Sequence, residues 1–144
     1  MNREDAHDAK EEERRMRQLG EEVEQLAYRA IGAAIEVHRL LGPGFLESVY
    51  QESLEIEFQI RGIACQPKKP VAITYKGHPV GAGQLDFMVG DSLIVELKAV
   101  EKLAPIHEAQ VISYLKMTKK NLALLINFNV PILKEGIKRI ILTS

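Results

Sequence analysis

The chain has 144 residues, of which 46% are hydrophobic and 27% are charged, and its formal net charge is -1. These values are typical of a single globular domain, so they exclude a largely disordered or fibrous chain. They also exclude a strongly basic coat protein, so any binding of nucleic acid has to use a local patch.

Residues 1–20 carry six acidic and five basic groups and almost no apolar side chain. This composition is typical of a frayed helix or a disordered arm. We therefore expect a charged flexible or helical arm over residues 1–20 and one domain over residues 21–144. A homodimer assembled through the arm is a further hypothesis. The sequence has neither the roughly 18–20 apolar residues of a membrane helix nor the apolar core of a signal peptide, and these absences predict a cytoplasmic protein with no membrane partner.

Two helical patterns open the domain. From Glu21 to Leu41, apolar residues recur at spacings of three and four, and Gly42-Pro43-Gly44 interrupts them. A second helical pattern begins near Phe45 and ends around Arg61-Gly62, where glycine favours a helix stop.

Pro67-Lys68-Lys69-Pro70 predicts an interruption of regular secondary structure, and strand patterns follow it. Residues 71–75 predict a strand, and residues 84–89 and 93–99 predict a hairpin joined by Gly90-Asp91-Ser92. A helix over residues 106–118 and strands over residues 122–128 and 137–142 complete the chain. Two helices, three strands, a helix and two strands indicate an α/β sandwich with a mixed sheet.

The predicted hairpin places charges inside apolar strands. Side chains alternate along a strand, so Glu96 and Lys98 share one face of the second arm. With a three-residue loop, Asp86 lies opposite Glu96 on that same face. A two-residue loop would instead place Asp86 opposite Val95 and separate the two acids.

Two carboxylates opposite one another repel, and a divalent cation such as Mg²⁺ compensates for the repulsion. Lys98 then points into the same site, where it can hold a water molecule or neutralise charge developing on a phosphate. An isolated Glu-x-Lys is usually a solvated stripe. The acid on the partner strand and the helix after the lysine favour the metal site here.

This combination resembles the PD-(D/E)xK nuclease superfamily, although Leu85 stands where the superfamily's name has proline. The resemblance implies a restriction-endonuclease-like α/β sandwich, in which helices flank a central mixed sheet. It also implies metal ligands at Asp86 and Glu96 and assistance from Lys98. The backbone carbonyl of Leu97, between Glu96 and Lys98, is a further expected ligand. The metal implied is Mg²⁺, for which Mn²⁺ substitutes.

From about Leu26 to Leu142 the chain resembles more closely a small prokaryotic family, the GxxExxxry proteins, through Gly44-x-x-Glu47. The arginine and tyrosine that end this family's motif fall on Gln51 and Glu52. Further resemblance lies in residues 95–100, 107–110, 113–116 and 125–128. A carboxylate in the first turn of a helix, such as Glu47, is explained by the helix dipole alone. The resemblance implies a further metal or water contact there.

Gln110 and Tyr114 are four residues apart and share one helical face. Their spacing resembles the Gln-x-x-x-Tyr motif of RecB-like members, which implies substrate positioning. His38 lies on the apolar stripe of the first helix, either as a core histidine or as a substrate-positioning residue beside Glu47.

The charges divide along the chain. Residues 21–97 contain eleven acidic and six basic groups, whereas residues 98–144 contain three acidic and eight basic groups. The basic side chains of the last third predict a positive border for phosphate beside the acidic site: Lys98, Lys102, Lys116, Lys119, Lys120, Lys134, Lys138 and Arg139.

These patterns predict a Mg²⁺-dependent nuclease that hydrolyses phosphodiester bonds in DNA, with RNA left open as a substrate. The alternative is a catalytically weak or inactive nuclease-fold module that binds or regulates within a larger nucleic-acid-processing or defence assembly.

Overall fold

The computed structural model describes residues 2–143. Its elements are α1 (Arg3–Leu41), α2 (Glu47–Ile60), β1 (Cys65–Tyr75), β2 (His78–Val89), β3 (Leu93–Lys98), α3 (Pro105–Thr118), β4 (Leu122–Asn127), the 3-10 helix η1 (Leu133–Gly136) and β5 (Ile137–Ile141). The strands form one sheet in the order β1-β2-β3-β4-β5. Only β3 and β4 pair in parallel; the other neighbours are antiparallel. The predicted order of elements and the mixed sheet are confirmed.

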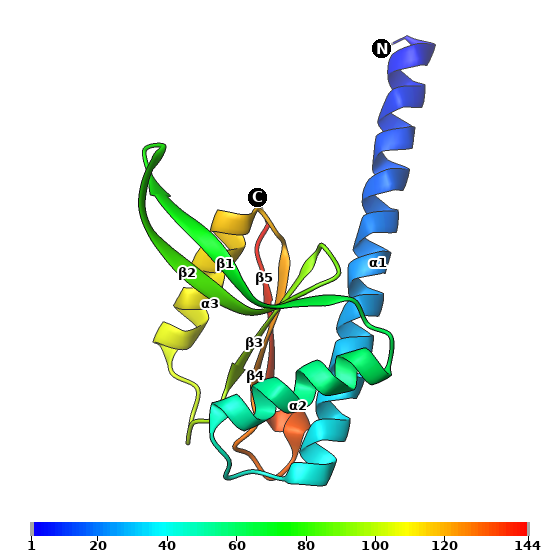
Figure 1. Cartoon of the computed structure of the whole chain (residues 1–144). Coiled ribbons are helices and arrows are strands. Elements are labelled where there is room, and N and C mark those ends of the chain that lie inside the picture. The colour runs from blue at the N-terminus through cyan, green and yellow to red at the C-terminus, as the bar shows by residue number, and fades with distance from the viewer. Residues whose placement is uncertain (1, 144) are drawn as a thin grey trace.

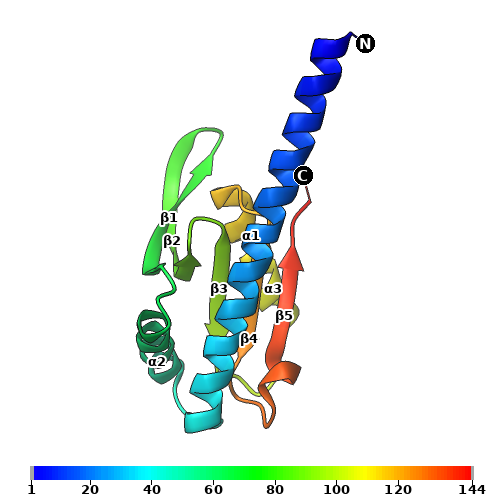
Figure 2. The same cartoon turned by 90° about the vertical axis from the view of Figure 1, so that its right-hand side faces the viewer.

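The sheet is covered on both faces. Helices α1 and α2 pack on one face, and α3 packs on the other (Figures 1 and 2). Every residue of β4 is buried, and so is every residue of β3 except Lys98. Such continuous burial is expected for central strands with helices on both sides. It makes a charged residue inside β3 unusual.

Helix α1 is continuous from Arg3 to Leu41, so it begins at Arg3 and not at Glu21. Asn2 caps it by accepting a hydrogen bond from the backbone N–H of Asp5 (2.9 Å). Ion pairs one turn apart lie along the charged segment and stabilise the helix there: Arg14–Glu11 and Arg15–Glu12. The division into an arm and a domain stays a prediction.

The buried stripe of α1 consists mainly of small side chains, which allow the helix to lie close to its neighbours: Ala27, Ala30, Ala33 and Ala34. Ile35, one of the apolar residues of the pattern between Glu21 and Leu41, is 40% exposed. No helix among residues 2–143 is both long enough and apolar enough to cross a membrane.

Strands β1 and β2 form a long antiparallel ribbon. The interruption of secondary structure predicted at Pro67–Pro70 is wrong, because these residues lie inside β1. β1 is an edge strand of the sheet, and an edge strand tolerates proline because one side of its backbone needs no partner. The predicted strand at residues 71–75 is therefore the distal part of β1.

The ribbon twists sharply at its base. Leu85 packs in the cluster that contains α3, whereas Phe87, two residues further, packs in the cluster with α1 and α2. Residues two apart in a regular strand lie on the same face. Lys68, between the pairs Pro67–Phe87 and Lys69–Leu85, has a φ of 50°. The change of face therefore falls at Asp86, opposite Lys68.

Candidate functional site

The hairpin between β2 and β3 has the register of a three-residue loop. Val89 pairs with Leu93, and the pairs Met88–Ile94 and Phe87–Val95 follow. Gly90 opens the turn with a φ of 56°, which a glycine adopts without strain. This register excludes the two-residue alternative and brings Asp86 to the level of Glu96.

Beyond Phe87–Val95, side chains take the place of the backbone ladder. The backbone N–H of Leu97 donates to Asp86 Oδ2 (2.7 Å), and the N–H of Asp86 donates to Glu96 Oε1 (3.0 Å). Gln51 Nε2, from α2, donates to the backbone carbonyl of Asp86 (3.0 Å). These three bonds hold both carboxylates where β2 and β3 separate.

Glu96 is only 4% exposed, the lowest exposure of any acidic residue in this region of the sheet. Burial, and then the charge of Asp86, raise the pKa of Glu96 to about 9, although Lys98 opposes the shift. Without a cation, the Glu96 carboxyl is therefore protonated at neutral pH.

Glu47 joins the acid pair from the first turn of α2. Burial, and then the charge of Asp86, raise the pKa of Glu47, and Lys98 again opposes the shift. Glu47 and Asp86 line a pocket of about 210 Å³ together with Ser48, Gln51, Glu52, Lys68 and Gln84. The structure thus gathers the predicted Glu47, Asp86, Glu96 and Lys98 into one electrostatic group.

The donor set fits a hard divalent cation. Within residues 2–143, no three His, Cys, Asp or Glu side chains form a ready-made metal cage. Mg²⁺ does not need one, because it is usually held by one or two carboxylates together with water and phosphate oxygens. The N–H of Leu97 faces Asp86, and the carbonyl of the same residue in a strand points to the same edge. That carbonyl therefore faces the gap as a third oxygen donor.

Gln51 and Lys68 belong to this site, although the sequence did not identify them. Gln51 lies four residues after Glu47 on α2, and this spacing, which places both on one helical face, is a signal for it. Lys68 lies in the segment that was predicted to interrupt secondary structure, and no pattern in the sequence indicated it as a site residue. Its place in the pocket follows from the twist of the ribbon.

The other three predicted residues lie on α1 and α3, and, like Glu96 and Lys98, they are not among the residues that line the pocket. Tyr114 packs on Gly83 of β2, where a Cβ atom would lie 2.7 Å from the tyrosine ring, and Gln110 is exposed one turn earlier on α3. His38 Nε2 is 2.7 Å from the carbonyl oxygen of Val130.

The predicted positive border is largely dispersed. Lys138 pairs with Glu108, and Arg139 pairs with Glu24. Lys116, Lys119 and Lys120 lie at the C-terminal end of α3, just before β4 begins beside Leu93. Because β3 runs about 17 Å from Leu93 to Lys98, these lysines lie at the end of the strand away from the acids. Of the predicted set, Lys98 is the residue whose charge acts on Glu47 and Glu96.

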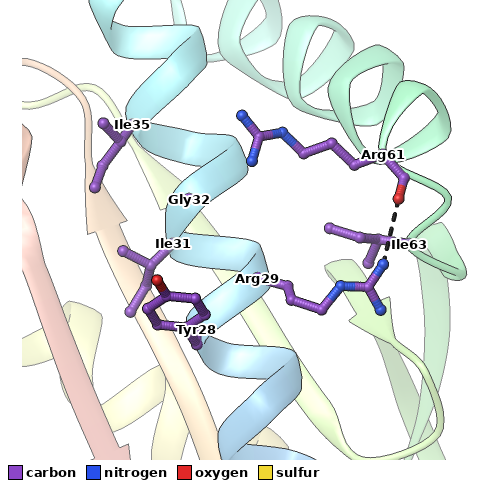
Figure 3. A pocket seen from close by; sticks show the side chains of 7 residues that line it. All are labelled: Tyr28, Arg29, Ile31, Gly32, Ile35, Arg61 and Ile63. Atoms are coloured by element: carbon purple, nitrogen blue, oxygen red, sulfur yellow. Dashed lines mark hydrogen bonds between the residues drawn. The ribbon is translucent and has the colours of Figure 1, made fainter.

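Another pocket, of about 440 Å³, lies between α1 and the C-terminal end of α2 (Figure 3). Arg29 Nη2 donates to the backbone carbonyl of Arg61 beside it (3.2 Å). Its lining consists of Tyr28, Arg29, Ile31, Gly32, Ile35, Arg61 and Ile63. This lining contains no carboxylate, so the pocket is not a candidate metal site.

Gln51→Leu should destabilise the protein by about 1–3 kcal/mol, because the buried carbonyl of Asp86 loses its donor. It should also weaken Mn²⁺ binding, since Asp86 is less firmly held. Urea unfolding and calorimetric titration with Mn²⁺ measure the two effects. The control is Gln59→Leu, on an exposed position of the same helix. Equal stability and equal Mn²⁺ affinity in both variants would contradict the supporting role of Gln51.

A family model described as the PD-(D/E)XK nuclease superfamily matches residues 24–140, a span that includes Glu47, Asp86, Glu96 and Lys98. No curated protein and no solved structure matches the chain.

Proposed function

The chain belongs to the PD-(D/E)XK nuclease superfamily, and we propose that it is a nuclease that uses Mg²⁺ to hydrolyse phosphodiester bonds in DNA. One observation carries this proposal. The carboxylate of Asp86 accepts a hydrogen bond from the backbone of β3, and that of Glu96 accepts one from the backbone of β2. Burial and the charge of Asp86 raise the pKa of Glu96, next to Lys98, to about 9. Two adjacent carboxyl groups of this kind favour the binding of a cation.

Asp86 and Glu96 are the proposed metal ligands, with the carbonyl of Leu97 as a third donor and Glu47 as a contact to metal or water. A divalent cation bound there, Mg²⁺ or Mn²⁺, supplies a Lewis acid that activates water and neutralises phosphate. Lys98, whose charge acts on both Glu96 and Glu47, orients the attacking water and stabilises the charge that develops on the phosphate.

Gln110 and Tyr114, on α3, are proposed to position the substrate or Lys98, as in RecB-like members. We assign His38 a structural role, because its ring bonds the carbonyl of Val130. Within the superfamily, Gly44-x-x-Glu47 supports placing the chain in the GxxExxxry family.

The direct test is incubation of supercoiled plasmid and of single-stranded DNA with the full chain in MgCl₂, in MnCl₂ and in EDTA. Cleavage with either cation and none in EDTA is the expected result. Cleavage that continues at the same rate in EDTA would overturn the metal dependence. No cleavage of any substrate, together with no Mn²⁺ binding, would overturn the proposal and favour a nuclease-fold module without catalysis.

Mn²⁺ affinity should rise with pH, because the cation displaces a proton from Glu96. The pKa of this carboxyl is raised from 4.5 to about 9, so it is mostly protonated below pH 9. A metal that binds the ionised form therefore gains up to about tenfold in affinity per pH unit between pH 6 and pH 9. Calorimetric titrations at three pH values measure this slope. An affinity that does not change with pH would show that Glu96 is not a ligand.

A further inference from the structure

The ribbon formed by β1 and β2 differs in charge from the region around it. Residues 65–85 contain no acidic residue but hold Lys68, Lys69, Lys76 and His78. The rest of the stretch from residue 21 to residue 97 carries eleven acidic and three basic groups. The ribbon is therefore the one basic segment of the acidic part of the sequence.

The distal half of this ribbon stands in solvent. All residues from Thr74 to Ala82 are exposed, and the ribbon curves away from the sheet (Figure 1). Its proximal half is anchored, because Val71 packs in the core cluster with α3 and Tyr114 fills the space beside Gly83. The distal part thus has a fixed base and two free faces.

The lysines of the ribbon are available to an anion. Among residues 2–143, the ion pairs found do not involve Lys69 or Lys76. Lys69 Nζ donates to Gln66 Oε1 (2.6 Å), and Lys76 Nζ lies 5.5 Å from the centre of the Tyr75 ring. Within the described residues, neither ammonium group therefore has a carboxylate partner, unlike Lys138 and Arg139.

The base of the ribbon is continuous with the acid pair. Lys68 lines the same pocket as Glu47 and Asp86. From Lys68 to the end of β1 at Tyr75 the strand extends by about 23 Å, the length of roughly seven base-pair steps of duplex DNA. A two-stranded β-ribbon also has the width that the major groove admits.

We propose that the β1–β2 ribbon binds double-stranded DNA, with Lys69 and Lys76 on backbone phosphates, and leads the duplex to the acid pair. This inference rests on the proposed function, because it names the form of the substrate. The duplex is favoured over single-stranded DNA because Tyr75 is the only aromatic residue between Cys65 and Leu85, whereas single-strand binding uses several aromatic rings on which bases stack.

The test is fluorescence anisotropy of a labelled 20-base-pair duplex with the full chain in EDTA, at several salt concentrations. Each phosphate contact contributes about 0.9 to the slope of log affinity against log salt, so Lys69→Gln/Lys76→Gln should lower the slope by about 1.8. The charge-matched control is Lys10→Gln/Arg17→Gln on exposed positions of α1, which should leave the slope unchanged. Thermal melting checks that both variants fold.

Equal slopes for the wild type and the ribbon variant would overturn the inference. So would an equal loss of slope in the control, tighter binding of a single strand of the same length, or duplex RNA bound as tightly as duplex DNA. Ribbon-dependent duplex binding without cleavage in Mg²⁺ would keep this inference and overturn the proposed function. Cleavage with unchanged duplex binding by the ribbon variant would do the reverse.

Discussion

Lys98→Met should lower the rate of DNA cleavage by about 10²–10³-fold while the protein stays folded and still binds Mn²⁺. The ammonium of Lys98 acts on the charges of Glu96 and Glu47, but an ammonium group cannot ligate a cation. Its removal therefore affects the charge that develops during the reaction more than metal binding. Methionine keeps the length and apolar stem of the side chain. Plasmid nicking in MgCl₂ gives the rate, and calorimetry gives the Mn²⁺ affinity.

Lys102→Met is the matched control, because Lys102 is exposed in the loop after β3. It removes the same charge four residues further along the chain and should leave the rate within about twofold of the wild type. Wild-type cleavage by Lys98→Met would show that this lysine has no part in the chemistry. Equal loss in both variants would point to general attraction of DNA by positive charge.

Glu96→Gln should abolish Mn²⁺ binding and cleavage, yet raise the melting temperature in EDTA by roughly 3–6 °C. Burial and the charge of Asp86 raise the pKa of Glu96 to about 9 in the folded state. The folded protein therefore holds a proton that the unfolded chain releases above pH 4.5, so stability falls as pH rises from about 4.5 to 9. Glutamine has no proton to lose, and its amide can accept from Asp86 N–H and donate to the Asp86 carboxylate.

The gain in stability should disappear at pH 4, where the glutamate is neutral in both states. Glu101→Gln, on an exposed loop position, is the control and should change neither the melting temperature nor the metal affinity. Melting curves at pH 4 and pH 8 test the sign of the effect. A Glu96→Gln protein that is less stable than the wild type at pH 8 in EDTA would contradict this account of the buried acid.

The acid pair could be predicted because the chemistry of a short turn sets the register of a hairpin. Gly90-Asp91-Ser92 left a two-residue and a three-residue loop open, and counting back from the three-residue loop placed Asp86 beside Glu96, as the structure has it. The hydrogen bonds that cross between these residues in the structure follow from that register. No long-range information was needed, since both acids lie within eleven residues of one another.

The ribbon and the support of the site could not be predicted in the same way. Pro67 and Pro70 are tolerated in β1 because it is an edge strand, and sequence spacing does not show which strand lies at an edge. The change of face at Asp86 depends on the backbone of Lys68. The bond from Gln51 to the Asp86 carbonyl spans 35 residues, a contact that exists only once α2 packs beside the sheet.

The charge pattern along the sequence was real, but the fold redistributes it. The basic last third was expected to border the acids, yet α3 returns between parallel strands and carries its terminal lysines away from them. The lysines of β1 come from the acidic part of the chain, and the hairpin brings Lys68 into the pocket. The net charge of a sequence segment therefore predicts the surface potential poorly, because the fold places residues of one segment beside residues of the other.

The unbroken course of α1 has a mechanical consequence. Its 39 residues give a rod of roughly 58 Å, of which the part before Val23 is exposed and extends past the sheet (Figure 1). Because the alanine stripe of the same helix packs on the core, that packing sets the direction in which the amino-terminal part leaves the sheet. This part therefore forms a lever arm whose base is fixed by the same core that holds the acids.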